Sequence, residues 1–191
     1  MKTKILAATI VFAALTVALN PAISGIGIPA PYAPYLIYGL WEIPIVAAFL
    51  LISATSGVAI SLVNATVLFA LFPGSLPAGP FYNLIAIFSM LLGLYLARRF
   101  TKPESKQQQK AILKIAAAST ILGVILRVAI MTLVNYITLQ QPYPIGFELD
   151  EIAVVATLPL TAIFNGTTVL YTIPIGEFVA RVIKSRLKIE S

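Results

Sequence analysis

Six long apolar runs dominate the sequence and leave little room for anything else. They cover residues 5–19, 35–53, 57–72, 81–97, 111–137 and 160–182. A helix needs roughly 20 predominantly apolar residues to cross the hydrocarbon of a bilayer. Only 10% of the 191 residues are charged, against about 25% in a typical soluble domain. The sequence therefore predicts one all-α integral membrane domain over residues 1–191, a bundle of about six transmembrane helices.

The basic residues predict the orientation of this bundle. Twelve of the thirteen lysines and arginines fall before the first run, between the fourth and fifth runs or at the start of the fifth, and at or after the end of the last run. Basic residues near span ends stay on the cytoplasmic side during insertion. We therefore expect both termini in the cytoplasm and a multi-pass protein of the plasma membrane. The basic residues concerned are Lys2, Lys4, Arg98, Arg99, Lys102, Lys106, Lys110, Lys114, Arg181, Lys184, Arg186 and Lys188.

The first run also has an alternative interpretation. A basic start, a short apolar core and the small residues Ala22 and Ser24 are typical of a cleaved signal peptide. Cleavage would leave the orientation of the remaining runs unchanged. We retain the first run as a span.

The composition excludes most catalytic chemistry. The chain has no cysteine and no histidine, which removes thiol nucleophiles, imidazole bases and the common transition-metal ligands. It also has no G-x-x-x-x-G-K-[ST] phosphate loop, so any ATP hydrolysis must occur on another chain. Because the positive charges sit at span ends, the net charge of +6 does not indicate a nucleic-acid partner. We expect no enzyme, no catalytic residue and no metal site.

Three charged residues fall inside the predicted spans and away from the basic clusters at their ends: Glu42, Arg127 and Glu177. A charge at bilayer depth costs about 2.5–3.5 kcal/mol on insertion scales, so such a side chain faces protein or a water-filled cavity. Glu177 is near a span end and is interpreted as solvated or locally paired. Glu42 and Arg127 either neutralise each other or direct polar groups into a solute pocket, with Trp41 beside them. We expect Glu42→Gln to weaken ligand binding more than folding.

Polar residues follow two predicted helix faces. Arg127, Met131 and Asn135 recur at steps of four and so share one face. Asn165, Thr168 and Thr172 mark a similar stripe on the last span. Such amides and hydroxyls either bond neighbouring helices or line a pocket in the outer half of the bundle.

Small residues give the first span a face that another helix can approach closely. Ala14 and Ala18 form a small-xxx-small pair. This face packs either inside the bundle or against a partner subunit.

Three motifs, in this order, carry a resemblance to a known family. The second run has an acidic residue before an Ile-Pro pair, the fifth ends in Met-Thr-x-x-Asn-Tyr, and the sixth begins with Pro and a Phe-Asn pair. The chain resembles the substrate-binding S components of energy-coupling factor (ECF) transporters over nearly its whole length, and most of all their riboflavin-type members. The motif residues are Glu42, Ile43 and Pro44; Met131, Thr132, Asn135 and Tyr136; and Pro159, Phe164 and Asn165.

The resemblance implies a vitamin-binding subunit that docks onto a membrane coupling subunit driven by two ATPase subunits. Asn135 and Asn165 would hydrogen-bond the ligand ring, and Ala14 and Ala18 would form the docking face. Riboflavin or a related vitamin would be the transported ligand, with no further cofactor. One departure concerns the substrate, because Thr168 stands where riboflavin-type members often carry lysine.

Other functions remain open at this stage. The chain is also compatible with an S component for another vitamin or small heterocycle, or with a stand-alone carrier, although neither an internal repeat nor a continuous polar path is evident. An intramembrane enzyme would use Glu42, Asp150 or Glu151 in acid–base work. In an assembly protein, the polar residues would only join helices.

Overall fold

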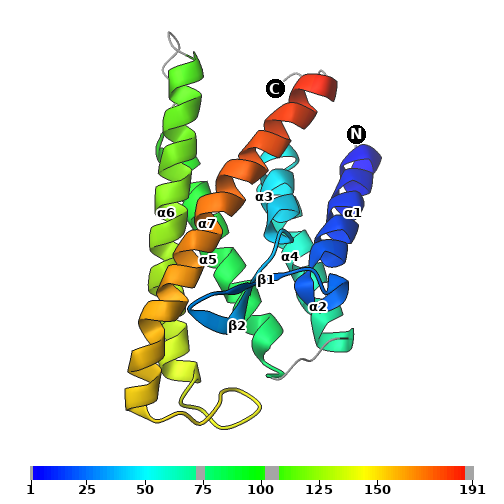
Figure 1. Ribbon diagram of the computed structural model, residues 1–191. Helices are drawn as coiled ribbons and strands as arrows, with labels where there is room; N and C mark the ends of the chain where they lie inside the picture. Colours follow the sequence, from blue (N-terminus) through cyan, green and yellow to red (C-terminus); the bar gives the residue numbers. More distant parts are fainter. Residues whose placement is uncertain (1, 72–75, 102–107, 188–191) are drawn as a thin grey trace.

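The structure is a computed structural model that describes residues 2–71, 76–101 and 108–187. Long helices run up and down side by side, and a short antiparallel hairpin crosses the bundle toward one end (Figure 1). The elements are, in chain order, α1 (Lys2–Leu19), α2 (Pro21–Ser24), β1 (Ile28–Ala30), β2 (Ala33–Tyr38), α3 (Glu42–Leu51), α4 (Ala54–Leu71), α5 (Gly79–Phe100), α6 (Gln108–Thr138) and α7 (Glu151–Leu187).

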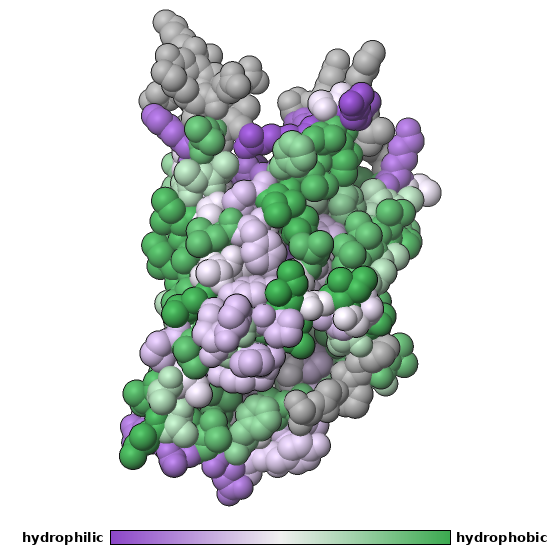
Figure 2. Space-filling model, viewed as in Figure 1, coloured by the Kyte–Doolittle hydropathy of each residue, from purple (hydrophilic) through white to green (hydrophobic). Residues whose placement is uncertain are grey.

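Four helical segments are long and apolar enough to cross a membrane, judged by length and composition. They are Ala54–Leu71, Gly79–Phe100, Leu113–Thr138 and Glu151–Arg186. Two shorter apolar helices, Thr3–Leu19 and Glu42–Leu51, complete the bundle. Figure 2 shows an apolar surface along much of the bundle, with strongly hydrophilic residues gathered at its two ends. The chain therefore forms a helical bundle suited to a bilayer. The count of six spans stays a prediction.

The start of α1 and the end of α7 lie at the same end of the bundle, together with the end of α5 and the start of α6 (Figure 1). We call this the basic end, because the clustered basic residues that the structure describes lie there. The arrangement agrees with an even number of passes between the basic blocks. Lys102, Lys106 and Lys188 lie outside the described residues. Which side of the membrane this end faces stays a prediction of the positive-inside rule.

The expected span over residues 35–53 is helical only in its second part. Residues 33–38 instead form β2, which pairs with β1 so that Ile28 lies opposite Tyr38. The helix that follows, α3, has only ten residues. A short apolar run of tyrosine, leucine and isoleucine suits a strand as well as a helix, and hydrophobicity alone does not separate the two. The hairpin adds one two-stranded sheet to the helical bundle that was expected.

The last helix begins earlier than expected, at Glu151 instead of residue 160. The Asp150 side chain accepts a hydrogen bond from the Ala153 backbone N–H (2.7 Å) and so caps the new start. Pro159, expected near the beginning of this span, lies inside the helix. With 37 residues, α7 is about 55 Å long and exceeds the roughly 30 Å hydrocarbon thickness.

Close helix contacts depend on glycine. A Cβ atom placed on Gly93 of α5 would lie 2.6 Å from backbone atoms of Leu122 and Gly123 in α6. Helices in membranes approach each other this closely only where small residues stand at the contact. The core beside this contact is closed by fully buried side chains from four helices: Ile45, Val46, Ile60, Met90, Leu94 and Ile173.

Candidate binding site

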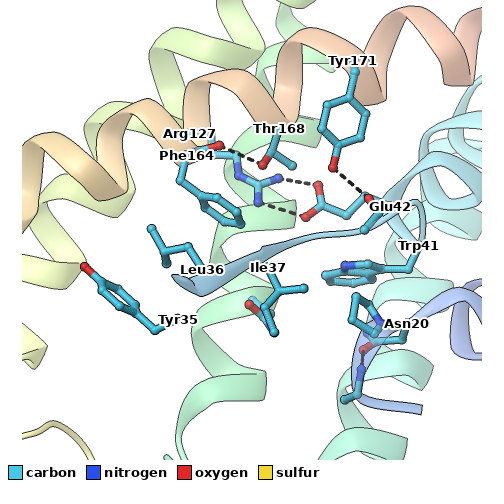
Figure 3. A pocket seen from close by; sticks show the side chains of 14 residues that line it. Asn20, Tyr35, Leu36, Ile37, Trp41, Glu42, Arg127, Phe164, Thr168 and Tyr171 are labelled. Carbon is cyan, nitrogen blue, oxygen red and sulfur yellow. Dashed lines mark hydrogen bonds and ion pairs between the residues drawn. The ribbon is translucent and has the colours of Figure 1, made fainter. Parts of the chain in front are cut away.

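A cavity of about 260 Å³ lies toward the end of the bundle opposite the basic end, beside the β1–β2 hairpin. We call it the hairpin cavity. Figure 3 shows side chains from the hairpin, α3, α6 and α7 converging on it. Its lining consists of Asn20, Pro21, Ala22, Tyr35, Leu36, Ile37, Gly39, Trp41, Glu42, Asn83, Arg127, Phe164, Thr168 and Tyr171.

A buried ion pair forms one wall of the hairpin cavity. The Arg127 guanidinium donates through Nη1 and Nη2 to the two carboxylate oxygens of Glu42, the Nη2 bond being 2.9 Å long. Its Nε donates to Asn165 Oδ1 at 2.9 Å. Both charged residues are only 3% exposed. This bidentate geometry is the strongest that arginine makes with a carboxylate, and the pair neutralises both charges at the cavity wall.

Three helices position this pair. Glu42 is the first residue of α3, directly after the hairpin turns back into the bundle. Arg127 lies near the middle of α6, and Asn165 faces it from α7. Asn165 Nδ2 in turn donates to the Thr161 carbonyl (2.8 Å), which fixes the orientation of its amide. Each side-chain nitrogen and carboxylate oxygen of the pair therefore has at least one hydrogen-bond partner, as buried polar groups require.

Aromatic rings and hydroxyl or amide groups form the rest of the cavity. Trp41, Phe164 and Tyr171 line it beside the ion pair (Figure 3). The Tyr171 hydroxyl donates to the Gly39 carbonyl at 2.8 Å, which joins α7 to the segment after β2. Thr168 Oγ1 donates to the Phe164 carbonyl within α7. A site with apolar ring faces and a few placed polar groups is typical of small-molecule binding.

Tyrosine hydroxyls hold the hairpin against α7. Tyr38 Oη lies 2.6 Å from Thr167 Oγ1 and 2.5 Å from Tyr32 Oη. The Tyr38 ring also packs against Phe164, with ring centroids 4.7 Å apart. Lost hydration, followed by the hydrogen bond with Tyr38, raises the pKa of the Tyr32 phenol. The hairpin is therefore a fixed cover over one side of the cavity.

Removing the Tyr38 hydroxyl is expected to loosen this cover. A net hydrogen bond contributes about 1 kcal/mol, so Tyr38→Phe should speed the release of a bound ligand by about fivefold. Stopped-flow measurement of dissociation tests this. Tyr143→Phe is the matched control, because Tyr143 is an exposed tyrosine outside the cavity lining. Equal release rates in the two variants would contradict a covering role for the hairpin.

The structure brings together most of the residues predicted from sequence. Glu42, Trp41, Arg127 and Thr168 line the hairpin cavity, and Asn165 supports Arg127 from behind. Glu42 and Arg127 pair with each other, and the pair faces a cavity. That this cavity takes up a solute stays a prediction.

Asn135 and Tyr136 are not among the lining residues of this cavity. Tyr136 lies near the end of α6, where its hydroxyl donates to Glu151 Oε1 at 2.9 Å. Their role in ligand contact stays a prediction. Ala14 and Ala18 are exposed along α1, so neither is used in packing inside the bundle.

Sequence reasoning missed Asn20, Asn83 and Tyr171. Asn20 precedes Pro21, and its side chain caps α2 by accepting the Ala22 N–H at 3.1 Å. The Asn-Pro pair signals a turn but not a cavity wall. Tyr171 lies three residues after Thr168, so the polar stripe of α7 carried a signal for it.

Comparison with known proteins gives a fold relationship. The chain is similar to a solved structure described as the S component of a bacterial ECF transporter, with a TM-score of 0.73 and 22% sequence identity. The similarity covers 99% of this chain and 100% of that one. No family model matches the chain, and no curated protein matches it in sequence. The chain therefore has the S-component fold.

Proposed function

We propose that this protein is the solute-binding subunit of an ECF-type vitamin importer in the plasma membrane, and that it captures riboflavin or a similar flat vitamin in the hairpin cavity. The observation that carries the proposal is the cavity itself, in which a neutralised ion pair and three aromatic rings meet beneath a fixed hairpin. The shared S-component fold supports solute capture over bond-making chemistry.

The lining favours one kind of ligand. Because the charges of Glu42 and Arg127 cancel, the cavity suits a neutral molecule better than an ion. Trp41 and Phe164 offer ring faces for a flat heterocycle, and the amide of Asn83 offers donors and an acceptor for its polar edge. Riboflavin has these properties, and so do other small vitamins. Thr168, in place of the lysine of riboflavin-type members, keeps those other vitamins as alternatives.

The transport cycle requires partners in this proposal. The chain has no phosphate-loop motif, so energy would come from two ATPase subunits through a membrane coupling subunit. The exposed Ala14 and Ala18 of α1 are the proposed contact with that coupling subunit, since small residues permit close helix approach. Uptake into proteoliposomes by this chain alone would instead favour a stand-alone carrier.

Calorimetric titration of the purified protein with riboflavin, thiamine and biotin tests the ligand. We expect riboflavin to bind most tightly and to quench the fluorescence of Trp41, the single tryptophan, which lines the cavity. Phe164→Leu should weaken binding by up to about tenfold, because a ring stack contributes about 0.5–1.5 kcal/mol.

Phe178→Leu is the control for this substitution. Phe178 is an exposed phenylalanine on the same helix and lies outside the cavity lining, so its replacement should leave affinity unchanged. Tighter binding of another vitamin would reassign the ligand, and the absence of binding by all three would contradict vitamin capture.

A further inference from the structure

A second cavity, of about 280 Å³, lies at the basic end of the bundle, remote from the hairpin cavity. It is bounded by α3, α5, α6 and α7. Its charged lining consists of Arg98, Glu177, Arg181 and Lys184. Three positive charges therefore face one negative charge, which leaves an excess of two positive charges in this lining.

Glu177 organises the cationic groups. Its side chain is only 3% exposed and accepts hydrogen bonds from Arg98 Nη2 at 3.1 Å and Arg181 Nη2 at 2.6 Å. The two arginine side chains are 41% and 50% exposed. Each guanidinium has five N–H donors and binds Glu177 through one terminal nitrogen. One buried carboxylate thus holds two half-exposed guanidiniums, from α5 and α7, at the edge of the same cavity.

The other part of the lining is apolar. Leu50 and Leu51 from α3 and Ile115 from α6 lie next to the charged rim. An inorganic anion would use only the rim. A molecule with a phosphate group beside a hydrocarbon segment would use both parts of the lining, because arginine binds phosphate through its planar fork and the leucine side chains gain from apolar contact.

The position of the cavity indicates where such a molecule comes from. The basic end carries the clustered lysines and arginines that the structure describes, which the positive-inside rule assigns to the cytoplasmic face. This leaflet is rich in anionic lipids, and basic pockets between transmembrane helices on this side bind lipid headgroups.

We propose that the cavity around Glu177 binds the phosphate of an anionic phospholipid headgroup, held by Arg98, Arg181 and Lys184, with the start of an acyl chain against Leu50, Leu51 and Ile115. The shared chemistry is a phosphate anion, and free inorganic phosphate is the competing source. The site is separate from the hairpin cavity, so it stands whether or not the protein captures a vitamin.

Native mass spectrometry of the detergent-purified protein tests this assignment. The protein is titrated with phosphatidylglycerol, with phosphatidylcholine and with inorganic phosphate. We expect one retained phosphatidylglycerol in preference to phosphatidylcholine. Lys184→Gln should weaken this retention about fivefold, since each basic residue near anionic lipid contributes about 1 kcal/mol. Lys184→Arg should restore it.

Lys184 is chosen because its replacement leaves both hydrogen bonds of Glu177 in place. Arg186→Gln is the charge-matched control, an exposed basic residue two positions further along α7 and outside the cavity lining. Equal loss of lipid in Lys184→Gln and Arg186→Gln, or equal retention of both lipids, would overturn the site. Displacement of the lipid by equimolar inorganic phosphate would overturn its assignment to a phospholipid.

Discussion

Replacing Arg127 with methionine is expected to lower the free energy of unfolding by about 3–5 kcal/mol. The substitution leaves the Glu42 carboxylate buried at 3% exposure without its two guanidinium bonds. It also removes the donor to Asn165 Oδ1. Denaturant titration in detergent micelles, followed by Trp41 fluorescence, measures the loss.

The double variant Glu42→Met/Arg127→Met is the control for this prediction. It removes both charges, and apolar residues in place of a buried ion pair are often neutral or stabilising. We expect it to unfold at a higher denaturant concentration than Arg127→Met alone. If the double variant is the less stable of the two, the ion pair is not the source of the loss. The same pairing means that Glu42→Gln should now cost stability as well as affinity, in contrast to the expectation from sequence.

Gly93→Ala is expected to cost roughly 3 kcal/mol of unfolding free energy, toward the upper end of the usual range for overpacking. The added methyl group would lie 2.6 Å from the backbone of Leu122 and Gly123, and a backbone cannot move aside as a side chain can. Helices α5 and α6 must separate to admit it. The same denaturant titration measures the change.

Gly166→Ala is the matched control for this substitution. A methyl group there meets nothing nearer than a Val128 side-chain carbon at 3.6 Å, which is ordinary contact distance. Since alanine favours a helix over glycine by about 1 kcal/mol, this variant should be as stable as the parent or more so. Equal destabilisation by the two substitutions would show that the α5–α6 contact is less close than the structure has it.

The helices were predictable where a long apolar run is bordered by basic residues, because both features then indicate the same span. Residues 81–97 and 111–137 correspond to α5 and α6, which extend beyond the predicted runs at both ends. The predicted element boundaries were wrong where particular hydrogen bonds, not the apolar pattern, decide the local structure. Asp150 moves the start of α7 to Glu151 through a single cap. Residues 35–38 joined a strand because the chain folds back onto Ile28, a pairing that periodicity within one run does not contain.

The candidate site was partly visible for a physical reason. Charges inside apolar runs are costly, so Glu42 and Arg127 stood out before any contact was known. Their pairing depends on where Glu42 lies along the bundle axis relative to Arg127. The short helix α3, which begins at Glu42, sets this position, and the sequence did not reveal it. Tyr171 continues the polar stripe of α7, but the sequence did not single it out because a tyrosine in an apolar run is equally typical of an interfacial anchor.

The neutralised wall of the hairpin cavity has an electrical consequence. A charge crossing the membrane field exchanges about 2.3 kcal/mol per 100 mV, and an exposed charge is screened by dissolved ions. Glu42 and Arg127 are the only charged residues in the described lining. Because they neutralise each other, the lining presents no net charge to the membrane field or to dissolved ions. Binding of an uncharged ligand in this cavity should therefore be independent of the membrane potential and of the salt concentration.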